Sequence, residues 1–180
     1  MSGYNPYGGV PSYGSPQPAS YNYASWIARV AASIVDMVVT VVAAIPFIIG
    51  TVMIAASTES HTDAQGYTVV DSGPSAAGIV VTGLGVLFYI GFAIWNIIFR
   101  QGTTGASLGK SALGLRLVRE TTGQPLGAGL CFVRQIAHIL DGICYIGYLW
   151  PLWDAKRQTF ADKVIGSVVH VPSNQEIYGR

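Results

Sequence analysis

Residues 27–56 read IARVAASIVDMVVTVVAAIPFIIGTVMIAA, and residues 76–99 read AAGIVVTGLGVLFYIGFAIWNIIF. Each stretch is longer than the roughly 20 residues that a helix needs to cross a bilayer. The first contains only Arg29 and Asp36 as charged residues, and the second contains none. Pro46 is the expected kink point of the first stretch, because proline interrupts helical hydrogen bonding. These stretches predict two transmembrane helices.

The composition agrees with a membrane protein. Of the 180 residues, 51% are hydrophobic and only 11% are charged, and the mean hydropathy is +0.43. Soluble domains are charged at roughly 25% of their positions. The net charge of +1 gives no broad basic surface, which excludes nucleic acid as an expected partner. We therefore expect the protein to lie in a lipid bilayer. Its length allows one domain.

The charges between and after the two helices predict their orientation. Residues 57–75 hold three acidic residues and no Lys or Arg. The segment after the second helix holds Arg100, Lys110, Arg116 and Arg119 against Glu120. By the positive-inside rule the acidic loop lies outside, and the basic segment and the N-terminus lie in the cytoplasm.

A third apolar region, Leu130 to Trp153, is interrupted by polar residues, glycines and Pro151. A straight third span would leave Lys156, Arg157 and Lys163 outside, against the charge rule. We therefore favour a re-entrant or interfacial element, or a hairpin of two short helices, that returns the chain to the cytoplasm. The residues alone do not choose between these forms.

The predicted fold class is an all-α integral membrane protein with a small cytoplasmic β element. The segments Leu115–Val118 and Val164–Val171 have the composition of strands and can pair on one side of the membrane. Residues 1–25 carry no charge and are rich in Tyr, Pro and Gly, so they predict a disordered tail. The membrane domain is then 26–172, and 173–180 is a C-terminal tail.

Polar residues form a stripe along the first helix. Arg29, Ser33, Asp36 and Thr40 are spaced so that they share one face. Arg29 can reach the headgroups, but Asp36 lies about 10 Å deeper and needs a partner or a proton. In the third region, Arg134, His138 and Asp141 have the same spacing, so we expect Asp36 to pair with Arg134 or His138.

The two octapeptides RVAASIVD, from Arg29, and RQIAHILD, from Arg134, are identical at four of eight positions. They are either copies of a duplicated element, packed face to face, or chance similarities between short apolar segments. A carboxylate inside a membrane is a candidate cation or proton site. The alternative is an ion pair that fixes helix packing.

No set of residues predicts an enzyme. Gly105 to Gly109 fits the G-x-S-x-G pattern of a nucleophilic serine, but it follows a membrane helix rather than a strand. No nucleophile–base pair or metal-ligand set converges. We expect no catalytic residue, metal or cofactor, and we interpret Cys131 and Cys144 as small apolar residues.

Three motifs carry a resemblance to a known family. They are ASWIAR at 24–29, GASLGK followed by GLRLV at 105–118, and DAKRQTFADKVIG at 154–166. Over roughly residues 24–172 the chain resembles the RDD family of bacterial membrane proteins, named for one arginine and two aspartates. The resemblance implies that these are Arg29, Asp36 and Asp162, and the tail resembles those of actinobacterial members.

The resemblance implies a place in the bacterial inner membrane but little about function. Ligand transport is suggested for the family, and cation/proton exchange for some members. We consider two functions. The first is a non-catalytic accessory or assembly subunit of a larger membrane complex. The second is an oligomeric cation- or proton-coupled transporter that uses Asp36 with Arg134, His138 or Asp141.

Overall fold

The first helix begins at a capping serine and ends just before a proline. In the computed structural model, which describes residues 21–173, α1 (Trp26–Ala43) is capped by the side chain of Ser25. The chain breaks at Ala44 and continues as α2 (Ile45–Ser57). Pro46 is well placed in the first turn of α2, where its missing N–H is not needed. The apolar stretch 27–56 thus divides beside Pro46, as predicted.

A second long helical segment runs from Ala76 to Thr104. It consists of α3 (Ala76–Ile94), a π-helical turn η1 (Trp95–Arg100) and α4 (Gln101–Thr104). By length and composition, α1 and this segment are the two described helices that could each cross a membrane, and α2 is a shorter apolar helix. Two candidate spans were predicted, and two are found.

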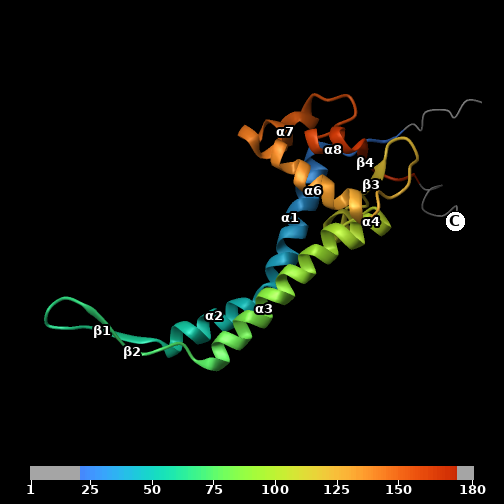
Figure 1. The fold of residues 1–180 in the computed structure, drawn as a ribbon. Helices are drawn as coiled ribbons and strands as arrows, with labels where there is room; N and C mark the ends of the chain where they lie inside the picture. Colours follow the sequence, from blue (N-terminus) through green and yellow to red (C-terminus); the bar gives the residue numbers. More distant parts are fainter. Residues whose placement is uncertain (1–20, 174–180) are drawn as a thin grey trace, which may run out of the picture.

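Helices α2 and α3 form an arm that extends away from the rest of the molecule (Figure 1). Their backbones approach closely: a Cβ added at Gly85 would lie 2.3 Å from the backbone nitrogen of Phe47. At the tip of the arm, β1 (Glu59–Thr62) and β2 (Thr68–Ser72) form an antiparallel hairpin. The sequence predicted only an acidic loop there, because these residues lack an alternating apolar pattern.

The other end of the molecule contains a small sheet. Strand β3 (Arg116–Arg119) pairs antiparallel with β4 (Ser167–His170), and Leu117 lies opposite Val169. The two predicted strands are therefore confirmed as partners, but Val164 and Ile165, predicted as the start of the second strand, belong to the helix Phe160–Ile165. The core lies between this sheet, the start of α1 and α6 (Ala128–Gly142), and it consists of Ala24, Ala32, Leu115, Leu117, Leu126, Cys131 and Val169.

The described end of the expected N-terminal tail is attached to this sheet. The backbone N–H of Ala24 donates to the carbonyl of Val169 at 2.9 Å, and Tyr23 forms a β-bridge with His170. Residues 21–25 are therefore part of the folded domain, which corrects the predicted boundary at residue 25. Residues 1–20 of the expected tail, and 174–180 of the C-terminal tail, lie outside the described residues.

The third apolar region is bent rather than straight. Helix α6 is followed by η2 (Ile143–Tyr145), α7 (Ile146–Leu149) and η3 (Trp150–Leu152). The segment Ile146–Leu152 turns away from α6 by 103°, as expected for an interrupted element. Helix α6 and this segment make a third candidate span only if the two bent pieces are taken together as one span. After it, α8 (Phe160–Ile165) leads into β4.

Candidate functional site

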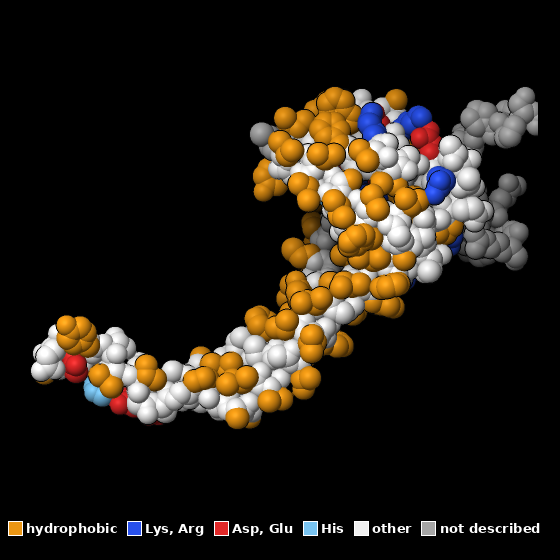
Figure 2. Space-filling model, viewed as in Figure 1, with side chains coloured by type: hydrophobic (Ala, Val, Ile, Leu, Met, Phe, Trp, Pro, Cys, Tyr) orange, Lys and Arg blue, Asp and Glu red, His pale blue; other side chains and the backbone are white. Residues whose placement is uncertain are grey.

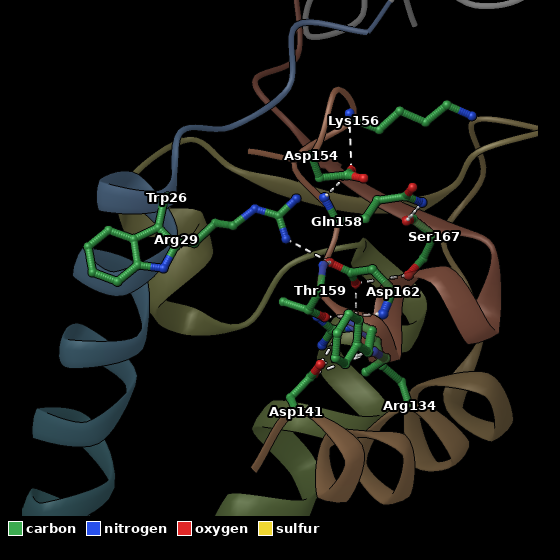
Figure 3. Close-up of polar contacts among 12 residues, drawn as sticks. Trp26, Arg29, Arg134, Asp141, Asp154, Lys156, Gln158, Thr159, Asp162 and Ser167 are labelled. Atoms are coloured by element: carbon green, nitrogen blue, oxygen red, sulfur yellow. Dashed lines mark hydrogen bonds and ion pairs between the residues drawn. The ribbon is translucent and has the colours of Figure 1, made fainter. Parts of the chain in front are cut away.

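A cluster of three buried charges joins α1, α6 and α8 (Figure 3). Nη1 of Arg29 lies 2.7 Å from Oδ2 of Asp162, and Nε of Arg134 lies 2.9 Å from Oδ1 of the same carboxylate. Asp162 is fully buried and is fixed by the capping box of α8, in which the Asp162 N–H donates to Thr159 Oγ1 and the Thr159 N–H donates to the Asp162 carboxylate. One carboxylate therefore holds three helices together.

The charges around Asp162 determine its protonation. Burial raises the pKa of this carboxyl, but the charges of Arg134 and Arg29 outweigh that effect and hold the pKa well below its ordinary value. Asp162 is therefore ionised at neutral pH, and it neutralises one of its two arginine partners.

Asp36 is bound by uncharged donors, not by Arg134 or His138. Its carboxylate accepts hydrogen bonds from Asn96 Nδ2 at 2.9 Å, from Ser107 Oγ at 2.5 Å and from the backbone N–H of Gly109 at 2.8 Å. The predicted pairing of Asp36 with α6 is therefore wrong. The reason is geometric: α5 (Leu108–Ala112) lies against Asp36, while Arg134 is engaged with Asp162.

The rest of the polar stripe bonds to its own helix. Ser33 Oγ donates to the carbonyl of Arg29 at 3.0 Å, and Thr40 Oγ1 donates to that of Asp36 at 2.7 Å. All four stripe residues line a cavity of about 1100 Å³ beside α1. The four residues therefore face one cavity, together with apolar residues of α1 such as Val30 and Ile34.

His138 and Asp141 pair with each other. Nδ1 of His138 lies 2.6 Å from Oδ2 of Asp141, and the ring of Tyr148 stacks on the histidine with centroids 5.7 Å apart. Asp141 is fully buried and also accepts the backbone N–H of Phe160 at 2.8 Å, at the start of α8. This pair therefore ties α6 to α8 rather than to Asp36.

Several residues of the site were missed by the sequence analysis. Asn96 and Gln101 are fully or almost fully buried, and Lys110 lines the cavity with Gln101. The sequence does contain a signal for Asn96: it is an amide within the apolar stretch 76–99, and a buried amide needs a hydrogen-bond partner. The residues of the G-x-S-x-G pattern have a structural role. Ser107 caps α5, and Gly109 allows α5 to approach Asp36 closely.

A Cβ at Gly109 would lie 2.0 Å from the carbonyl oxygen of Ala32. Only glycine therefore permits the contact between α5 and α1 that supplies Asp36 with its donors. Among residues 21–173, no three His, Cys, Asp or Glu side chains are grouped as ligands for a metal ion. The site consists of ion pairs and hydrogen bonds between helices, beside a cavity.

Comparison with known proteins identifies the relatives of this chain. The RDD family model matches residues 23–166. The proline-rich antigen homolog of Mycobacterium tuberculosis (strain CDC 1551 / Oshkosh) is 42% identical over 152 residues, which cover 82% of this chain and 62% of that protein. The proline-rich antigen of Mycobacterium leprae (strain TN) is 38% identical over 151 residues, which cover 81% of this chain and 60% of that protein.

The chain thus spans about three fifths of the length of these curated relatives, which are both actinobacterial. No solved structure matches it. The matched region includes Arg29, Asp36 and Asp162, the three residues that the resemblance assigned to the family motif. The chain belongs to the RDD family.

Proposed function

We propose that the chain is a non-catalytic subunit of a larger assembly in the bacterial inner membrane. The observation that carries this proposal is the internal pairing of the motif charges. Asp162 is bonded to both Arg29 and Arg134, and Asp36 accepts three hydrogen bonds from its own chain. Charges held in this way fix the packing of helices, because breaking such a buried pair is strongly destabilising.

The distribution of charge supports a cytoplasmic N-terminus. Figure 2 shows acidic side chains at the tip of the arm and Lys and Arg side chains at the opposite end, with hydrophobic side chains between them. The tip carries Glu59, Asp63 and Asp71. Under the positive-inside rule, the sheet of β3 and β4 and residues 21–25 beside it lie on the cytoplasmic side in this proposal.

The arm supports the assembly part of the proposal. Large apolar side chains on α3 are exposed over half or more of their surface, among them Ile79, Val80, Leu84, Leu87 and Phe88. In the described residues the arm has two helices, so its outer faces are available to lipid or to other membrane subunits. Membrane helices associate by close packing along such faces.

The experiment that tests this function is gentle purification of the tagged full chain from its native membrane, followed by measurement of the mass and composition of the particle. A second protein in fixed stoichiometry is the expected result. A particle that contains this chain alone would contradict the accessory function.

A transporter is the second candidate, and the cavity favours it. Arg29, Ser33, Asp36 and Thr40 line the cavity together, so a polar path follows α1 for about 17 Å. If the chain transports a cation or proton, Asp36→Asn should abolish flux in proteoliposomes while the protein remains folded. Absence of flux with the unchanged protein would contradict transport.

A further inference from the structure

The cavity beside α1 is long and opens at the surface of the membrane region. Its lining on the α1 side extends from Trp26 to Ala44, which corresponds to roughly 27 Å of helix. Figure 2 shows the surface hollowed between the arm and the part of the molecule that contains α6 and α7. A ligand in this cavity would therefore lie along α1 and remain in contact with the bilayer.

One end of the cavity carries an excess of positive charge, because Arg29, Lys110 and Arg134 line it against the single carboxylate of Asp36. Lys110 donates from Nζ to Gln101 Oε1 at 2.7 Å, and among the described residues no carboxylate forms an ion pair with it. Burial, together with the nearby charge of Arg134, lowers the pKa of Lys110 to about 8, so the amine is largely protonated at neutral pH. Lys110 is thus a half-buried cation whose hydrogen-bond partner is uncharged.

Arg29 adds unused donors at the same end. Its Nη1 is paired with Asp162, but its Nε and Nη2 are buried without a hydrogen-bond partner in the described part of the chain. Buried donors without an acceptor are costly, and those of a charged group are more so. The Asp36 and Asp162 carboxylates accept the donors described above, and neither gives an acceptor to Nε or Nη2 of Arg29. An anionic oxygen from a ligand would satisfy both cations.

Away from the polar stripe of α1 and the polar side chains of α6, the lining of the cavity is mostly apolar. Its walls come from α1, α2 and α3, and they include Ile34, Met37, Val41, Phe47, Val86 and Ile90. Such a wall suits a hydrocarbon chain. The cavity is therefore complementary to an anionic amphiphile, because it has positively charged residues at one end and a mostly apolar wall along the rest.

We infer that this cavity binds a membrane lipid with a phosphate-bearing anionic headgroup, with the phosphate at Lys110 and Arg29 and an acyl chain along α1 toward Ala44. Charge complementarity selects the headgroup, since Arg and Lys both bind phosphate through charge-assisted hydrogen bonds. Basic pockets between membrane helices are known to bind anionic headgroups. The open side of the cavity selects a lipid over a soluble anion.

The headgroup is tested by native mass spectrometry of the full chain in an uncharged detergent. Phosphatidylglycerol and phosphatidylcholine with the same acyl chains are titrated in turn, and the bound fraction is measured. We expect phosphatidylglycerol to bind about tenfold more tightly, because both lipids carry the same phosphodiester but the cationic choline of phosphatidylcholine would be repelled by Lys110 and Arg29. Lys110→Met should remove this preference, and Lys110→Arg should retain it. Lys156→Met is the matched control, because Lys156 pairs with Glu120 away from the cavity.

The apolar part is tested separately on α3. Ile90 lines the cavity, whereas Leu87 is 69% exposed and does not. Ile90→Trp should weaken binding of phosphatidylglycerol about tenfold by filling the space for the chain, and Leu87→Trp should leave it unchanged. Thermal unfolding of each variant confirms that the fold is retained.

Three results would overturn the inference. The first is equal binding of the two lipids, and the second is an equal effect of Lys110→Met and Lys156→Met. The third is displacement of the lipid by millimolar inorganic phosphate, which would identify a site for the free anion instead.

Discussion

The Asp36 carboxylate accepts the backbone N–H of Gly109 at 2.8 Å, and the Asp141 carboxylate accepts that of Phe160 at the same distance. Gly109 lies in the first turn of α5, and Phe160 in the first turn of α8. A carboxylate in this position satisfies a free N–H and interacts favourably with the helix dipole. The two aspartates therefore hold two short helices in the same way.

This equivalence extends to the residues around them. Each aspartate lies seven residues after an arginine, and both arginines, Arg29 and Arg134, bind Asp162. Each short helix begins at a hydroxyl cap, Ser107 or Thr159, and is followed by a strand; the two strands, β3 and β4, pair with each other. The shared pattern favours duplication over chance as the origin of the two similar octapeptides.

Asp162 is expected to contribute more to stability than any exposed carboxylate. Asp162→Asn leaves Arg29 and Arg134 buried without a countercharge, so we expect a loss of about 3–5 kcal/mol in the free energy of unfolding. The measurement is equilibrium unfolding in detergent micelles. The control is Asp71→Asn, which removes a half-exposed partner of His61 and should change the value by less than about 1 kcal/mol. Equal losses in the two variants would contradict the role of the buried cluster.

The same cluster predicts a loss of stability in acid. Because the pKa of Asp162 is held below the ordinary value of about 3.9, the unfolded chain binds this proton first as the pH falls. The contribution of Asp162 is complete above about pH 4 and decreases as the pH falls below that value. Unfolding measured from pH 7 to pH 3 should show a smaller acid dependence in Asp162→Asn than in the unchanged chain. Parallel curves would argue against a depressed pKa at this residue.

The sequence predicted the membrane helices and the strand pair better than the partners of Asp36. Apolar length and strand composition depend on the segment itself, so α1, α3, β3 and β4 were foreseeable. The spacing of the polar stripe predicted which face of α1 carries Asp36, but it could not predict which segment packs against that face. The contact depends on Gly109 approaching Ala32, and such a contact between distant segments has no local pattern. Charge attraction suggested Arg134, but Asp162 already binds that arginine.

Gly109→Ala is expected to separate α5 from α1. The added methyl group would lie 2.0 Å from the Ala32 carbonyl oxygen, a backbone atom that cannot move aside alone. We expect a loss of about 1–3 kcal/mol, measured by the same unfolding assay. Gly83→Ala is the matched control within α3, because a Cβ there would meet nothing within 4 Å. That substitution should be neutral or slightly stabilising.

The orientation of the chain can be measured by cysteine labelling in intact cells. In a background without the native cysteines, Gln65→Cys at the tip of the arm should react with an impermeant maleimide added outside. Ser173→Cys, just after β4, should react only after the membrane is permeabilised, because the proposed topology has the sheet on the cytoplasmic side. Labelling of Ser173→Cys from outside would reverse this part of the topology.

Ser107→Ala tests whether the serine of the G-x-S-x-G pattern is structural. Ser107 accepts the Lys110 N–H as the cap of α5 and donates to Asp36, so its removal breaks two bonds. We expect a loss of about 1–2 kcal/mol, which is typical for a helix cap. Ser111→Ala, on the same helix, removes only a bond from the exposed side of Arg100 and should cost less than about 0.5 kcal/mol. The double variant Asp36→Asn with Ser107→Ala should lose less than the sum of the single losses, since each substitution removes the same charge-assisted hydrogen bond between Ser107 and the Asp36 carboxylate. Strictly additive losses would show that the two side chains act independently, contrary to the 2.5 Å contact between them.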